Sequence, residues 1–124
     1  MIRILILALT VFYLLTGLYI AILPQDFYFS APGVQATGPY NMHFIRDVGF
    51  AFLTSSAAVG YGIYAGLRPL MLFGSLWLLI HGLFHLSLWV FHGAPLDSAA
   101  LVDAVLVSIP AIAIFALCLR YRVT

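Results

Sequence analysis

The chain has 124 residues, of which 65% are hydrophobic and only 7% are charged, and its formal net charge is +1. So few charged side chains cannot cover the surface of an ordinary soluble domain, and a charge this small, spread over distant positions, disfavours nucleic-acid binding. A single cysteine, Cys118, excludes an internal disulfide and a cysteine-based metal site. A chain of this length forms a single domain.

Four apolar stretches follow one another, at about residues 2–23, 42–66, 69–92 and 97–119. Each is close to the ~20 residues that a helix needs to cross the hydrocarbon core of a bilayer. Because a backbone in lipid must satisfy its own hydrogen bonds, we expect helices rather than strands. The links after the second and third stretches are very short, and short links make successive helices antiparallel. The sequence therefore predicts an all-α, integral membrane, up-down-up-down four-helix bundle.

The first stretch begins near Arg3 and has to be distinguished from a signal peptide. Its apolar run exceeds the ~7–15 residues of a signal h-region, and no small-x-small cleavage site follows, so we interpret it as a retained helix. Four of the five arginines flank the stretches on one side when the N-terminus is cytoplasmic: Arg3, Arg68, Arg120 and Arg122. The positive-inside rule then predicts a multi-pass protein with both termini in the cytoplasm.

The long connection, residues 24–41, lies on the outer side in this topology. Prolines and glycines interrupt it, so it cannot be one regular element. Its aromatic residues, Phe27, Tyr28 and Phe29, favour a position on the bilayer surface or over the mouth of the bundle.

Features of the second and fourth stretches bear on how the helices pack. Small residues at four-residue spacing in the second stretch permit close approach within the monomer: Ala58, Gly62 and Gly66. In the fourth stretch, Asp97, or Ser98 one residue later, can cap the helix N-terminus. Pro110 frees a backbone carbonyl and should bend that helix, which would widen the bundle near Asp103.

Ionisable residues within the apolar stretches gather at one depth. A rise of ~1.5 Å per residue puts Asp47, His85 and Asp103 roughly 8 to 10 Å below the outer boundary. A charge in hydrocarbon costs a few kcal/mol or more, so such residues indicate a functional site by default. The same count places Arg46 at this level, His81 deeper, and His43, His92 and Asp97 at the outer rim.

One interpretation of this cluster is a metal site. His81 and His85 are four residues apart and share a helix face, and Asp47 and Asp103 would complete a four-ligand set. Imidazole and carboxylate suit a transition metal such as zinc, iron or copper. Histidines on facing helices, such as His43 and His85, are also the arrangement that haem requires, but nothing else in the chain supports haem.

Two interpretations need no metal. In one, a small polar or anionic ligand enters from the outer face, or protons are relayed, through His43, Arg46, Asp47, His85 and Asp103. In the other, Arg46 pairs with Asp47 or Asp103 and the cluster only fixes helix register. The protein would then be a non-enzymatic assembly or accessory subunit, as a homo-oligomer or with a membrane partner. The sequence leaves these alternatives, and the question of enzymatic activity, open.

The segment PGVQATGPYNMHFIRDVGFAFL, followed by HGLFHLSLW, resembles small bacterial four-helix membrane proteins of uncharacterised function, which are loosely similar to the DoxX-like group. The shared pattern comprises Asn41, His43, Phe44, Arg46, Asp47 and Gly49, then His81 and His85. The resemblance implies a protein of the bacterial inner membrane, surrounded by lipid, and it implies no particular reaction.

Overall fold

The computed structural model describes residues 1–122, and within this range it contains helices and no strand. Four segments are long and apolar enough to cross a membrane. They agree with the predicted stretches to within one or two residues at each end. The segments are α1 (Ile2–Ile22), α3 (Met42–Ala65), α4 (Arg68–Phe91), and a last one in which α5 (Ser98–Val102), η2 (Asp103–Ser108) and α6 (Ile109–Arg120) are continuous.

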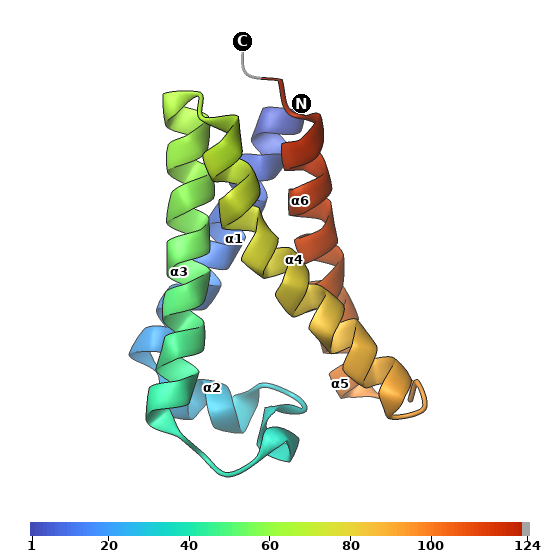
Figure 1. Ribbon diagram of the computed structural model, residues 1–124. Helices are drawn as coiled ribbons and strands as arrows, with labels where there is room; N and C mark the ends of the chain where they lie inside the picture. Colours follow the sequence, from blue (N-terminus) through green and yellow to red (C-terminus); the bar gives the residue numbers. More distant parts are fainter. Residues whose placement is uncertain (123–124) are drawn as a thin grey trace.

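The long segments surround one core. The start of α1, the end of α6 and the turn between α3 and α4 lie at one end of the molecule, and the other two connections lie at the opposite end (Figure 1). Each long segment packs on two others: α1 on α3 and α6, and α4 on α3 and on η2 with α6. Toward the end that carries the connections after α1 and α4, α4 diverges from α3 (Figure 1). The divergence leaves η2 as the element that packs on α4 toward that end.

Glycines set the spacing between the helices. A Cβ on Gly17 of α1 would lie 2.9 Å from the carbonyl oxygen of Gly49 in α3, and a Cβ on Gly62 would lie 3.0 Å from the backbone nitrogen of Met71 in α4. A Cβ on Gly82 of α4 would lie 2.7 Å from the Cβ of Ala111 in α6. The prediction that Gly62 serves packing inside the monomer is thus confirmed.

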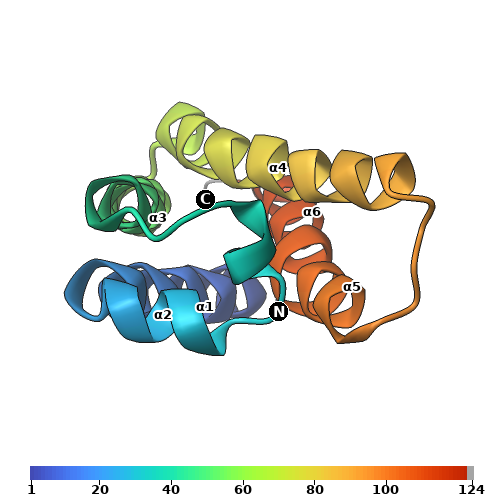
Figure 2. The same ribbon diagram turned by 90° about the horizontal axis from the view of Figure 1, so that it is seen from below.

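The connection between α1 and α3 forms two short helices, α2 (Pro24–Ser30) and η1 (Val34–Thr37), in agreement with the prediction that it is not one regular element. Tyr28 is buried and its hydroxyl donates to the carbonyl of Gly38 at 2.8 Å, which ties the segment together. A Cβ on Gly33 would approach the Cβ of Ala99 in α5 to 3.1 Å. The connection therefore crosses the end of the bundle from α1 to α5 (Figure 2).

The last long segment departs from regular α-helix directly before Pro110. Residues Asp103–Ser108 form the π-helical segment η2, and α6 begins at Ile109. Proline has no N–H to donate to the preceding turn, so a wider turn is one way for a helix to accommodate it. The bend expected at Pro110 stays a prediction, but the helix is irregular directly before this proline, and the irregular segment contains Asp103.

Candidate functional site

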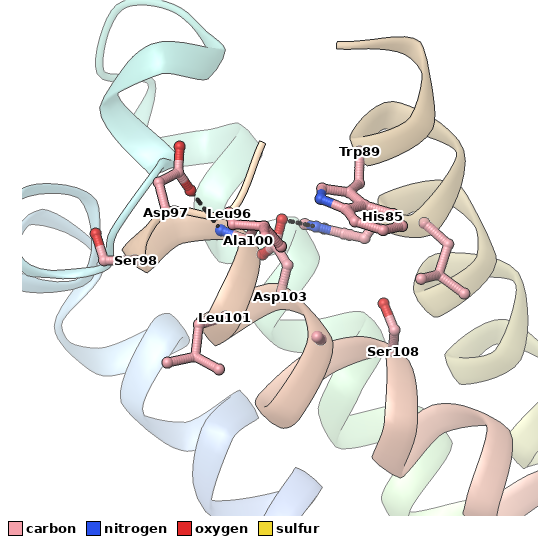
Figure 3. Close-up of a pocket in the computed structure, with 11 residues that line it drawn as sticks. His85, Trp89, Leu96, Asp97, Ser98, Ala100, Leu101, Asp103 and Ser108 are labelled. Atoms are coloured by element: carbon pink, nitrogen blue, oxygen red, sulfur yellow. Dashed lines mark hydrogen bonds and ion pairs between the residues drawn. The ribbon is translucent and has the colours of Figure 1, made fainter. Parts of the chain in front are cut away.

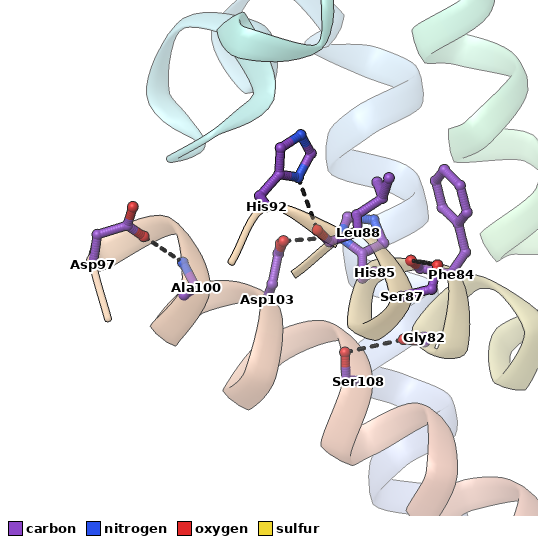
Figure 4. Close-up of polar contacts among 10 residues, drawn as sticks. All are labelled: Gly82, Phe84, His85, Ser87, Leu88, His92, Asp97, Ala100, Asp103 and Ser108. Atoms are coloured by element: carbon purple, nitrogen blue, oxygen red, sulfur yellow. Dashed lines mark hydrogen bonds and ion pairs between the residues drawn. The ribbon is translucent and has the colours of Figure 1, made fainter. Parts of the chain in front are cut away.

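The centre of the site is a contact between α4 and η2. The Nδ1 atom of His85 lies 3.0 Å from the Oδ2 atom of Asp103, and both side chains are partly exposed, by 25% and 35% (Figure 4). Within residues 1–122 this is the one ion pair. When Nδ1 carries the proton, it donates to the carboxylate and leaves the Nε2 lone pair of the imidazole free to accept a proton, a hydrogen bond or a metal ion.

Backbone packing holds the two helices together next to this pair. Gly82 precedes His85 by one turn and lets Ala111 of α6 approach closely. Ser108, the last residue of η2, is buried, and its hydroxyl donates to the carbonyl of Gly82 at 3.1 Å (Figure 4). The π-helical segment thus begins at Asp103, which contacts His85, and ends at Ser108, which bonds to Gly82 of α4.

The His85–Asp103 pair faces a pocket of about 490 Å³ (Figure 3). α4 supplies one wall with His85, Leu86 and Trp89, and α5 and η2 supply the other. Most of the lining is apolar, and its ionisable groups are the His85–Asp103 pair and, at the rim, Asp97. An apolar cavity of this size with a few convergent polar groups is the usual form of a small-molecule site. The remaining lining residues are Leu96, Ser98, Ala100, Leu101, Ala104 and Ser108.

The turn between α4 and α5 forms the rim of the pocket. The indole Nε1 of Trp89 donates to the carbonyl of Pro95 at 2.9 Å, so the tryptophan ring is fixed at the rim. Asp97 caps α5 by accepting from the backbone N–H of Ala100 at 2.8 Å, which confirms the predicted cap. His92 is exposed, and its Nδ1 lies 2.8 Å from the carbonyl oxygen of Leu88 in its own helix.

Behind His85, an aromatic stack extends toward the middle of α4. The ring of His81 stacks on Trp77 with centroids 4.9 Å apart and planes 10° apart, and it meets the edge of Phe52 from α3 at 5.4 Å. His81 and His85 are 4.7 Å apart between ring centroids. The two histidines are neighbours, as their four-residue spacing predicted, but His81 is held by aromatic rings rather than by a carboxylate.

The structure does not bring the α3 residues of the predicted cluster to this pair. The Nε of Arg46 donates to the carbonyl of Ala21 in α1 at 3.2 Å, so the predicted pairing of Arg46 with Asp47 or Asp103 is corrected. The reason is that α3 packs on α1 at this level, through Gly17 and Gly49. Asp47, one residue further around the helix, and His43, one turn earlier, are exposed.

The four-ligand metal set is likewise not assembled. In the described part of the chain, no three His, Cys, Asp or Glu side chains are grouped so that they could hold one ion. Of the proposed ligands His81, His85, Asp47 and Asp103, the structure pairs His85 with Asp103 and places His81 beside His85. Axial haem ligation by His43 and His85 finds no support either, because His43 is exposed on α3.

Several residues of the site were not singled out from the sequence. Trp89, Ser108 and the apolar lining of the pocket were not identified as parts of a site. Trp77, His81, His85 and Trp89 follow one another at four-residue intervals, a spacing that places them along one slowly turning stripe of the helix. That stripe could have indicated Trp89 as a neighbour of His85.

Comparisons with protein-family models, with curated proteins and with solved structures find no match for this chain.

Proposed function

We propose that this chain is a multi-pass protein of the bacterial inner membrane, an up-down-up-down bundle with both termini in the cytoplasm. Four helices of suitable length and hydropathy support insertion. Arg3 lies in the first turn of α1, Arg68 begins α4 and Arg120 ends α6. These helix ends and the α3–α4 turn lie at one end of the molecule (Figure 1), as the positive-inside rule requires for a cytoplasmic face. The resemblance to small bacterial four-helix membrane proteins supports the same location.

Within this protein, the pocket between α4 and η2 binds a small ligand that arrives from the outer face. The observation that carries the proposal is the 3.0 Å contact between His85 and Asp103 in the wall of a pocket of about 490 Å³. Polar side chains inside a membrane segment are costly unless they are paired or serve a site. Here they are paired and also reach an open, largely apolar cavity, so one end of a ligand can bond to them while its body contacts the leucines.

The arrangement favours an organic ligand over a metal ion held by the protein alone. A carboxylate that orients a histidine also stands behind many bound metal ions, but His85 and Asp103 are only two potential ligands and do not make a full coordination shell. Zinc, iron or copper would therefore bind here only with groups from the ligand or from water. The proposed site needs no metal to be complete.

A variant that fills the pocket tests this function. Ala104 lines the cavity, and Ala104→Trp places an indole in it. Native mass spectrometry of the gently purified protein should detect a bound small molecule in the wild type and a large loss of it in Ala104→Trp, while elemental analysis detects any metal. Thermal unfolding verifies that the variant is folded. Equal ligand content in the two proteins would contradict the proposal, whether that content is zero or high.

A second candidate is a non-enzymatic assembly or accessory subunit in which the polar residues are structural. It is favoured by the bonds that join α4 to η2 and α6, the His85–Asp103 contact and the Ser108–Gly82 hydrogen bond. Within residues 1–122, no buried side-chain nitrogen or oxygen lacks a hydrogen-bond partner, so no fully buried polar atom requires a ligand. This candidate predicts a ligand-free protein that co-purifies with further copies of itself or with a membrane partner.

A further inference from the structure

The pocket has an unbalanced set of charges. Its ionisable lining residues are Asp97, Asp103 and His85, and no arginine is among the lining residues that the structure describes. With both carboxylates ionised, the formal sum is −2 when His85 is neutral and −1 when it is protonated. Arg46, the arginine that the sequence placed at the depth of this cluster, donates instead to a backbone carbonyl of α1. The sign of the pocket is therefore negative in either state of His85.

Each carboxylate retains capacity for a ligand. The Oδ2 atom of Asp103 contacts His85, and the Oδ1 atom of Asp97 accepts from Ala100. A carboxylate has about four acceptor positions on its two oxygens, so one contact on each leaves positions free. Asp103 lines the pocket beside His85, and Asp97 lies at the rim (Figure 3). A cation entering from the outer end would meet Asp97 first.

The rest of the pocket suits a cation that carries an apolar body. Trp89 presents an indole ring whose position is fixed by its bond to Pro95, and the face of an indole attracts cations within about 6 Å. Leu86, Leu96 and Leu101 supply apolar contacts for a hydrocarbon chain or ring. An anion, by contrast, would face two carboxylates without a compensating arginine.

We propose that the pocket selects small amphiphilic amines, molecules with a protonated amine and an apolar body, and that Asp103 is the principal specificity-determining residue. This inference rests on the proposed function of the pocket as a ligand site and goes further by naming the charge of the ligand. It reverses the expectation of an anionic ligand, which depended on Arg46.

Three probes with a phenyl ring on a three-carbon chain, which end in a cationic, a neutral and an anionic polar group, test the inference: 3-phenylpropylamine, 3-phenylpropan-1-ol and 3-phenylpropionate. The chain has two tryptophans, so Trp77→Phe leaves Trp89 as the single tryptophan, whose emission reports on the pocket. The full-length protein is placed in phosphatidylcholine nanodiscs, whose zwitterionic lipid does not favour either charged probe, and empty nanodiscs correct for partition into lipid.

We expect the Trp77→Phe protein to bind the amine about tenfold more tightly than the alcohol, and to bind the carboxylate more weakly than both. A tenfold ratio corresponds to about 1.4 kcal/mol, which is within the range of a charge-assisted hydrogen bond. Asp103→Asn should lower the affinity for the amine about tenfold and leave that for the alcohol within twofold. Asp26→Asn removes an exposed carboxylate from α2, outside the pocket, and should change neither affinity.

A second variant keeps the test decisive if Asp103→Asn does not fold. Asp97→Asn removes the rim charge and retains a side chain that caps helices well, so a loss of amine affinity is expected there too. Equal binding of amine and alcohol, tightest binding of the carboxylate, or amine affinity unchanged in both Asp variants would overturn the charge selectivity while leaving the pocket as a ligand site. If no probe at saturating concentration altered the emission of Trp89, both the charge selectivity and the proposed function of the pocket as a ligand site would fail.

Discussion

At the scale of single residues, the site depends on how His85 and Asp103 satisfy each other. Both are partly exposed to the pocket, so their contact is worth less than a fully buried ion pair, in which solvent screening is absent. Each is nevertheless surrounded by apolar side chains on a helix proposed to lie in the membrane. Removal of one partner leaves the other polar group without its bond among apolar side chains, whereas removal of both leaves no unpaired group.

A double-mutant cycle measures this coupling. We expect His85→Leu and Asp103→Leu each to lower the free energy of unfolding, and the double variant to lose less than the sum, with a coupling of about 1 kcal/mol. Thermal or detergent-induced unfolding of the purified protein provides the measurement. His92, which bonds to its own helix, gives a matched cycle with Asp103 that should be additive. Strict additivity in the His85 cycle would refute a direct contact.

The residue scale is also where prediction from sequence was weakest. The depth of Asp47, His85 and Asp103 was calculated from helical rise alone, and rise does not specify which neighbour each helix faces. Arg46 was assigned to Asp47 or Asp103 by depth and charge, but the close packing of α3 on α1 directs it to the carbonyl of Ala21. Among the predicted cluster residues on different helices, His85 and Asp103 are brought into contact.

At the scale of elements, α4 is positioned by its glycines. Gly82 lies between His81 and His85, where an added Cβ would meet the Cβ of Ala111 at 2.7 Å and the Cα of Ser108 at 3.3 Å. The absence of a side chain there allows α6 and η2 to approach α4 closely enough for His85 to reach Asp103. The sequence predicted the four spans well because their length and hydropathy are local properties. It predicted a bend at Pro110, and did not predict the π-helical segment that begins at Asp103.

Substitution of glycine by alanine tests this packing with an internal control. Gly82→Ala should lower the free energy of unfolding by about 1–3 kcal/mol, because the methyl group overpacks a tight interface. It should also weaken ligand binding by moving α4 away from η2. Gly60→Ala adds the same methyl where the nearest atom, Cγ2 of Thr10, is at an ordinary 3.6 Å, and should be neutral or stabilising by about 0.5–1 kcal/mol. Equal effects of the two substitutions on unfolding would show that the α4–α6 spacing is not tight.

At the scale of the whole molecule, the proposed orientation places the pocket and the α2–η1 connection on the outer side of the membrane. The connection reaches from α1 across to α5, so it lies over the end of the bundle at which the pocket rim is found (Figure 2). The sequence anticipated this as one of two positions for the segment. It could not choose between them, because the choice depends on contacts such as that of Gly33 with Ala99.

Cysteine labelling in intact cells tests the orientation. In a Cys118→Ser background, Ala36→Cys places a thiol in η1, and Leu67→Cys places one in the α3–α4 turn; both positions are exposed. A membrane-impermeant maleimide should label Ala36→Cys in intact cells and Leu67→Cys only after the cells are permeabilised. The opposite pattern would invert the topology and put the pocket on the cytoplasmic side.

The proposed ligand site is tested most directly by His85→Leu, measured for both thermal stability and bound ligand against the wild type. We expect a folded protein with a modestly lower Tm, because leucine fits an apolar environment, and a loss of the small molecule that native mass spectrometry detects in the wild type. His81→Leu, which lies behind the pair in the aromatic stack, should have a similar or milder effect on the ligand. A folded His85→Leu protein that retains its full ligand content would contradict the assignment and show that the histidine is structural.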